Sequence, residues 1–169
     1  FTMSLFAGVS IRFITSQQEE LEAMAVTDVL TGLFNRTHLH GHLERALQQS
    51  RRAGTAMTLP MLDIDNFKAI NDAFGHPAGD DVLRGMETYF RRRIRNSDMV
   101  FRIGGEEFMV LLHDTNESDA RRTAAEVCAE IKVLPLLPGH DLTVSIGIAA
   151  LDPDDELEDW VKRSDEKLY

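Results

Sequence analysis

The chain has 169 residues, of which 43% are hydrophobic and 27% are charged, which suffices for one globular domain with its own core and a short appendage. Its formal net charge of -10 argues against a nucleic-acid polymer as a partner, because binding to a phosphate backbone needs a basic surface. The single cysteine, Cys128, excludes an internal disulfide and is compatible with a reducing cytoplasm.

The first residues of the chain, 1–14, are mostly apolar, carry Arg12 and are too few to cross a bilayer, which takes about 20 residues. They fit the end of a membrane helix or a packed helix, and the sequence leaves both open. We expect residues 1–21 to be a connecting or signalling helix after an upstream sensory or membrane region. We expect residues 22–169 to be a cytoplasmic domain. The chain starts at Phe1 and stops inside a helix-like run, so we expect it to be cut from a longer protein.

The following residues alternate between patterns typical of helices and of strands. A turn over 30–36, with Gly32 as its flexible point, leads through the predicted cap Asn35 into a helix. Pro60 predicts an irregularity or an edge position in the first long strand, because proline cannot donate a hydrogen bond to a neighbouring strand. We expect helices over 36–52, 65–74, 81–95, 116–132 and 155–169 and strands over 55–64, 99–103, 106–112 and 142–151.

Two of these strands, on either side of Gly104 and Gly105, have the pattern of a tight hairpin. Helices that alternate with strands, together with one hairpin, are typical of α/β or α+β layering. We therefore expect a mixed central sheet of about five strands that includes this hairpin and is surrounded by helices.

A carboxylate stands at the end of the first long strand. Asp63 is followed by a loop and a helix, which places it at the rim of the sheet beside free N–H groups of the helix. Mg²⁺ prefers hard oxygen ligands and shares them with phosphates, and helix N-termini attract anions. Asp63 is therefore a candidate metal ligand, with the carbonyl of Ile64 as a second. Asp65 stays open between a helix cap and a metal role.

The hairpin turn carries two adjacent glutamates between apolar runs, where desolvation of a carboxylate is costly without a cation or hydrogen bonds. If the turn lies next to Asp63, then Glu106 and Glu107 meet the same cation. Three carboxylates around a divalent ion suit metal-assisted phosphoryl or nucleotidyl transfer. The preceding glycines, Gly104 and Gly105, let a nucleotide approach the backbone closely. The alternative is a solvated acidic turn.

Five segments together resemble the GGDEF family, the diguanylate cyclases, in its GGEEF form. They occur in the order and approximate spacing of that family, and the resemblance covers about residues 22–169. The segments are DVLTGLFNR (28–36), DIDNFKAINDAFGHPAGDDVL (63–83), FRIGGEEF (101–108), TVSIGIA (143–149) and RSDEKLY (163–169). The resemblance implies a palm-like fold similar to that of nucleotidyl cyclases.

The resemblance also implies a reaction, in which two GTP molecules condense to cyclic di-GMP and release two pyrophosphates. Each domain holds one GTP, and two domains face each other in a homodimer. By the family pattern, Asp63, the carbonyl of Ile64 and Glu106 hold Mg²⁺ or Mn²⁺. Glu107 is a further metal ligand or the base for the 3′-hydroxyl, and the sequence does not separate these roles.

The same resemblance assigns the substrate-binding residues. The phosphates would contact the backbone of Asn66, Phe67 and Lys68, next to Gly104 and Gly105. Guanine presents two adjacent donors, which suit the carboxylate of Asp80, with Asn71 as a second contact to the base. Adenine lacks that donor pair and would leave the carboxylate unpaired. The alternatives are a surface polar residue for Asn71 and a helix cap for Asp80.

An R-x-x-D pattern, Arg95 and Asp98, lies shortly before Gly104. The resemblance makes it an inhibitory site for the product, since arginine binds phosphate or guanine and aspartate accepts from guanine. The alternative is an exposed ion pair. A second arginine from the next helix is not evident, because Arg121 and Arg122 lie further upstream than expected.

Two other functions remain open for the whole chain. One is a catalytically silent module that senses GTP or cyclic di-GMP, and the other is a palm-like nucleotidyl cyclase or polymerase with a different substrate. His38 and His42 are four residues apart and could bind a transition metal, but we interpret them as a solvated cluster.

Overall fold

The computed structural model describes residues 26–166, which form a five-stranded sheet with helices on both faces. The strands are β1 (Phe34–Asn35), β2 (Met57–Ile64), β3 (Met99–Arg102), β4 (Glu107–His113) and β5 (Val144–Ala150). The helices are α2 (Arg36–Ala53), α3 (Phe67–Phe74), α4 (His76–Arg93), α5 (Glu117–Val133) and α6 (Leu157–Glu166). The strand order is β1-β3-β4-β2-β5, with β1 parallel to β3 and the other neighbours antiparallel. The predicted mixed sheet is confirmed.

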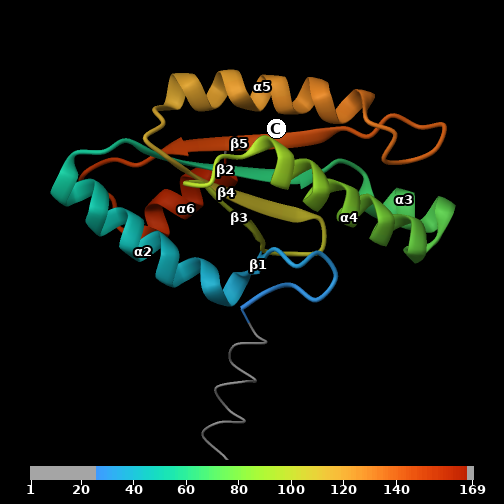
Figure 1. Cartoon of the computed structure of the whole chain (residues 1–169), viewed down its shortest axis with the longest axis horizontal. Coiled ribbons are helices and arrows are strands. Elements are labelled where there is room, and N and C mark those ends of the chain that lie inside the picture. The colour runs from blue at the N-terminus through green and yellow to red at the C-terminus, as the bar shows by residue number, and fades with distance from the viewer. Residues whose placement is uncertain (1–25, 167–169) are drawn as a thin grey trace, which may run out of the picture.

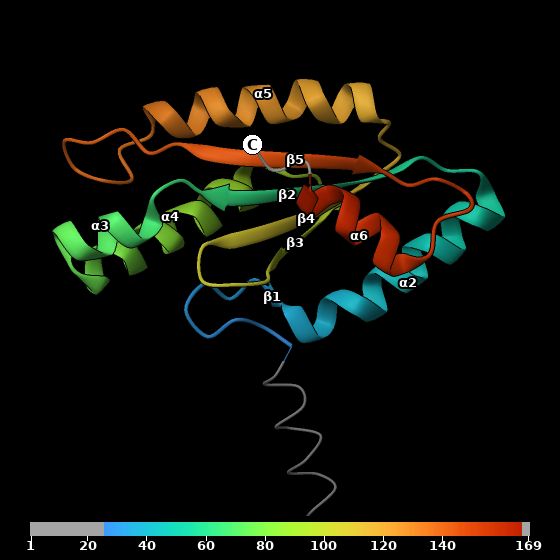
Figure 2. The same ribbon diagram turned by 180° about the vertical axis from the view of Figure 1, so that it is seen from behind.

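The two faces of the sheet carry separate hydrophobic clusters. Side chains alternate along β2, so that Leu62 packs toward α4 and α5 while Leu59 and Met61 pack toward α2 and α6. Figures 1 and 2 show these two helix pairs on opposite sides of the sheet. Trp160 of α6 is fully buried on the second face, and its indole N–H donates to the carbonyl of Ala149 at 2.8 Å.

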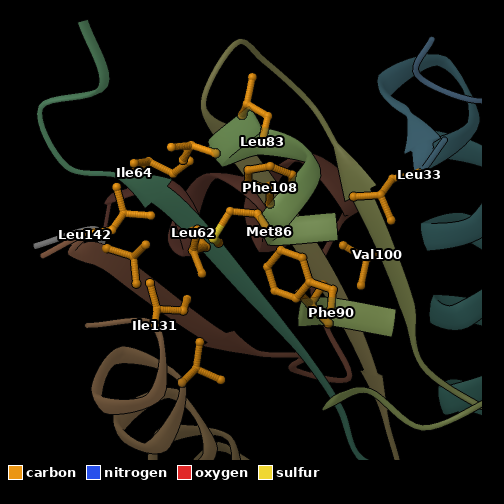
Figure 3. Close-up of a cluster of buried hydrophobic side chains, with 14 of the residues drawn as sticks. Leu33, Leu62, Ile64, Leu83, Met86, Phe90, Val100, Phe108, Ile131 and Leu142 are labelled. Atoms are coloured by element: carbon orange, nitrogen blue, oxygen red, sulfur yellow. The ribbon is translucent and has the colours of Figure 1, made fainter. Parts of the chain in front are cut away.

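The larger cluster lies under α4 (Figure 3). Val82, Met86 and Phe90 recur at intervals of four residues along this helix, which places them on one face. The ring of Phe90 lies 5.5 Å from that of Phe108 in β4, centroid to centroid. Burial of this stripe fixes α4, and with it the start of the helix, against the strands that carry the acidic residues.

Pro60 lies in a central strand, because β2 pairs with both β4 and β5. The predicted edge position is therefore wrong. The predicted irregularity is confirmed on one side only: Pro60 pairs with Ile148 of β5, whereas no residue pair joins β2 and β4 between Thr58 and Met61 in this described part of the sheet. The missing N–H group of proline is the physical reason for such an interruption.

Helix caps agree with local sequence signals in two places and differ in two others. Asn35 caps α2 as predicted, and Asn116 caps α5. The helix cap predicted at Asp65 is wrong, because α3 starts after Asn66 in a left-handed conformation with φ 56°. The alternative of a cap at Asp80 is also wrong, because α4 already starts at His76.

The predicted N-terminal helix, residues 1–21, lies outside the described residues. Within residues 26–166, no helix combines the length and apolar character needed to cross a membrane.

Candidate active site

The hairpin turn between β3 and β4 lies at the same end of the sheet as the C-terminal end of β2 (Figure 2). Asp63 is the register partner of Glu107 in β4 and of Ser145 in β5. The N–H of Ile64 donates to the carbonyl of Glu106 at 3.3 Å. The tertiary structure thus brings together the two acidic segments that the sequence predicted to meet.

Burial and the neighbouring carboxylates perturb the titration of Asp63. Burial raises the pKa of Asp63 to about 6, and the negative charges of Glu106 and Glu107 add to the effect. A nearby like charge disfavours the ionised form of a carboxyl group, which is the direction seen for Asp63. The rim of the sheet is therefore a region of uncompensated negative potential.

These residues fit a divalent cation by the chemistry of their donors. Carboxylate and carbonyl oxygens are the ligands that Mg²⁺ and Mn²⁺ prefer, and no sulfur is among them. Within residues 26–166, no three His, Cys, Asp or Glu side chains already converge on a closed metal cage. An open half-site of this kind suits an ion that takes its remaining ligands from phosphate oxygens and water.

The first glycine of the turn makes room for a carboxylate. A Cβ at Gly104 would lie 2.2 Å from Oε2 of Glu107, which no side chain could tolerate without a shift. A Cβ at Gly105 would meet nothing within 4 Å among the described residues. Gly104 thus lets Glu107 fold back over the turn, and Gly105 leaves open space above it.

Arg102 forms hydrogen bonds to the backbone of the hairpin turn, a contact that the sequence did not predict. Its guanidinium donates twice to the carbonyl of Gly105, from Nε at 3.2 Å and from Nη2 at 2.7 Å. Its Nη1 donates to Oδ1 of Asp28 at 2.8 Å. The same carboxylate accepts from the backbone N–H and the hydroxyl of Thr31. These bonds tie the segment before β1 to the turn that carries the glutamates.

The predicted phosphate cradle lies between β2 and α3. No side chain caps α3, so the N–H groups of Phe67 and Lys68 in its first turn remain free of a capping acceptor. Asp65 is held away from this helix terminus: its Oδ1 accepts from the hydroxyl of Ser145 at 2.6 Å. The end of α3 therefore presents its N–H groups on the same rim as Asp63.

Asn71 and the start of α4 meet at a glycine. A Cβ at Gly79 would lie 2.0 Å from Oδ1 of Asn71, so the carboxamide lies directly on the α4 backbone. Gly79 is buried, and the next residue is the half-buried Asp80. The packing of α3 on α4 brings the two residues predicted to recognise guanine into one neighbourhood.

A cavity lies between α4, α5 and the sheet, on the side of Arg95 and Asp98. Both residues line this cavity of about 190 Å³, and so does Arg122 of α5. Asp98 accepts from the N–H of His113 at 3.1 Å, which holds its carboxylate against β4. Arg122 lies further upstream in the sequence than expected for a second arginine, and it reaches the cavity because of how α5 crosses the sheet.

The histidine pair on α2 is less solvated than predicted. The ring centroids of His38 and His42 are 4.6 Å apart, and Phe34 stacks on the ring of His38 at 5.3 Å. Nε2 of His42 is buried without a hydrogen-bond partner. No third ligand completes a metal site there among the described residues.

A family model described as "Diguanylate cyclase, GGDEF domain" matches residues 25–169. Among curated relatives, the response regulator PleD of Caulobacter vibrioides is 38% identical over 152 residues, which are 86% of this chain and 34% of the relative. The diguanylate cyclase DgcP of Pseudomonas aeruginosa is 40% identical over 157 residues, 91% of this chain and 23% of the relative. The chain spans about a third or less of these relatives.

Solved structures show the same fold. The GGDEF domain of DgcB from Caulobacter crescentus, in complex with c-di-GMP, matches with a TM-score of 0.79 and 32% identity over 84% of each chain. The diguanylate cyclase SiaD from Pseudomonas aeruginosa, in complex with its activator SiaC, matches with a TM-score of 0.78 and 31% identity, over 98% of this chain and 66% of that one. With five strands in one mixed sheet, an acidic hairpin beside β2 and a family match over nearly its whole length, this chain belongs to the GGDEF-domain family of diguanylate cyclases.

Proposed function

We propose that this chain is a diguanylate cyclase, which condenses two GTP molecules to cyclic di-GMP with release of two pyrophosphates. The observation that carries the proposal is the convergence of Asp63, Glu106 and Glu107 at the rim that also holds the uncapped start of α3. Each protomer holds one GTP, so the reaction requires a homodimer. Residues 22–169 carry out this reaction in the cytoplasm.

The acidic residues at the end of β2 and in the hairpin turn would bind the metal ion. Asp63, the carbonyl of Ile64 and Glu106 hold Mg²⁺ or Mn²⁺, while Glu107 is a further ligand or the base for the 3′-hydroxyl. The bound cation supplies charge neutralisation for the triphosphate and lowers the pKa of the attacking hydroxyl. Gly105 leaves the space into which the nucleotide enters.

The protein's own groups orient the substrate. N–H groups at Asn66, Phe67 and Lys68 donate to phosphate oxygens, where the dipole of α3 also favours negative charge. Asp80 accepts from the N1–H and 2-amino groups of guanine, and Asn71, held on α4, makes a second contact. Two such protomers, face to face, place the 3′-hydroxyl of one GTP against the α-phosphorus of the other.

The cavity beside α5 is the product-inhibition site in this proposal. Arg95 and Arg122 would bind phosphate or the guanine edge, and Asp98 would accept from guanine donors. The complex of the DgcB domain with c-di-GMP supports ligand binding to a domain of this fold.

Activity is tested by incubation of the chain with GTP and Mg²⁺ and detection of cyclic di-GMP by chromatography, over a range of protein concentrations. We expect specific activity to rise with protein concentration, since two half-sites must meet. Glu106→Gln should abolish turnover, whereas Glu158→Gln, the same charge change at an exposed position of α6, should not. If GTP binds but no cyclic di-GMP forms at any concentration, the silent-sensor function is supported instead.

A further inference from the structure

One arginine of the cavity beside Arg95 is already held by carboxylates of α5. Arg93 lines that cavity, yet its Nη2 donates to Oε2 of Glu126 and its Nε to Oε2 of Glu130 at 3.2 Å. The pairs join the end of α4 to the middle of α5, and Arg93 is the member that lines the cavity. An anion that enters the cavity therefore meets an arginine whose charge is already paired with two carboxylates and two of whose five N–H donors are taken.

The two glutamates differ in how firmly they are placed. Glu130 accepts a second hydrogen bond, from the hydroxyl of Tyr89 at 2.6 Å, and this contact anchors it to α4. Glu126 has Arg93 as its only partner among the described residues, and half of its side chain is exposed. Glu126 can therefore leave Arg93 at little cost, while Glu130 keeps the arginine in place.

The other two arginines of the cavity show the contrast. The side chain of Arg95 makes no hydrogen bond or ion pair within residues 26–166. Arg122 donates from Nη2 to Oδ1 of Asp119 at 2.8 Å, on the exposed face of the same helix. The charge of Arg95 is thus unpaired before an anion binds, whereas Arg93 and Arg122 each already have a carboxylate partner.

We propose that Glu126 is a built-in competitor of the anionic ligand, which occupies Arg93 in the free protein and so sets a weaker affinity for cyclic di-GMP. This inference rests on the product-inhibition site of the proposed function. Cyclic di-GMP carries two phosphodiester charges, one more than Arg95 alone can neutralise. When the ligand binds, Arg93 turns from the carboxylate of Glu126 to a phosphate oxygen, and the freed carboxylate goes to solvent.

The size of the effect follows from exposure. A largely solvated ion pair is weak, so Glu126 moderates binding and does not block it. Removal of its charge also removes repulsion between a carboxylate and the phosphates, an effect that salt screens. We expect Glu126→Gln to tighten cyclic di-GMP binding by about threefold to tenfold at low salt.

The experiment is calorimetric titration of the 169-residue chain with cyclic di-GMP, at low and high ionic strength. The matched control is Glu117→Gln, which removes the same charge from the same helix but from a glutamate paired with Arg121, outside the cavity. An effect through Arg93 predicts that the gain of Glu126→Gln shrinks in an Arg93→Ala background to the part that comes from lost repulsion, and that high salt removes this remainder. The free energy of unfolding of each variant, from urea titration, checks that the fold is intact.

Each outcome decides one question. Equal affinity of Glu126→Gln and the unaltered chain, or an equal gain from Glu117→Gln, overturns the inference. If Arg95→Ala loses binding in that same experiment, the inhibitory site itself stands. Absence of binding to the unaltered chain overturns both the site and the inference, while the turnover assay with GTP still judges the cyclase proposal separately.

Discussion

Replacement of Arg102 by alanine should loosen the turn that carries Glu106. Arg102 is only 13% exposed, and the change removes its ion pair with Asp28 together with two hydrogen bonds to the carbonyl of Gly105. A hydrogen bond with a charged donor contributes about 1.5–3 kcal/mol, and the carbonyl of Gly105 stays open to water once the arginine is gone. We therefore expect a loss of about 2 kcal/mol in the free energy of unfolding.

The turn should also bind nucleotide less well, because Arg102 orients it without contact to the substrate. We expect GTP affinity in the presence of Mg²⁺ to fall by about tenfold, which corresponds to about 1.4 kcal/mol. Urea unfolding gives the stability change, and calorimetric titration with a slowly reacting GTP analogue gives the affinity. A double-mutant cycle with Asp28→Asn isolates the ion pair, which should couple by about 1 kcal/mol.

The matched control is Arg84→Ala, whose partner Asp81 lies on the exposed face of α4 with 75% of its side chain accessible. That change should cost less than about 0.5 kcal/mol. If Arg102→Ala is no more harmful than Arg84→Ala and leaves GTP affinity unchanged, the role of Arg102 as the anchor of the turn is refuted.

Three further changes probe the rim and the far end of the fold. Gly79→Ala should displace the side chain of Asn71. The loss in free energy of GTP binding should exceed the loss in free energy of unfolding, because that side chain can move aside without a shift of the backbone. An unchanged GTP affinity would count against a contact of Asn71 with the base. Asp80→Asn should reduce the preference for GTP over ATP by about tenfold or more in competition binding, and an intact preference would remove Asp80 from base recognition. The hydrogen bonds from Arg163 hold the pKa of Asp155 below its usual range, so this pair stabilises the fold fully above the unfolded pKa of about 3.9. The stability difference between the unaltered chain and Asp155→Asn should thus be constant near pH 7 and shrink as urea titrations are taken below about pH 4; a difference independent of pH would contradict this.

Local signals in the sequence were sufficient for much of the fold. Asn35 is a predicted cap, and its side chain accepts from the N–H three residues on; Asn116 caps α5 in the same way. The hairpin was predicted from two glycines between apolar runs, and it forms. These features depend only on residues a few positions apart, all of which are visible in the sequence.

Other predictions failed where a local pattern had more than one tertiary solution. Aspartate is a common helix cap, but the carboxylate of Asp65 accepts a hydrogen bond from the hydroxyl of Ser145, which lies in a strand far along the chain. Asp80 is also of a residue type that caps helices, but α4 starts before it, at His76, where Pro77 fits the first turn. Pro60 reads as an edge residue, yet β4 and β5 enclose its strand on both sides.

The residues by themselves determined that acidic groups follow one strand and precede another, because periodicity and turn chemistry act over a few positions. Only the tertiary structure decided that Arg102 joins Asp28 to the turn, that Asn71 rests on Gly79, and that Arg93 is shared between two glutamates of α5. Each of these contacts links segments whose separation in space is set by sheet order and helix packing. Long polar side chains reach several neighbours equally well until the hydrophobic core fixes which of them is near.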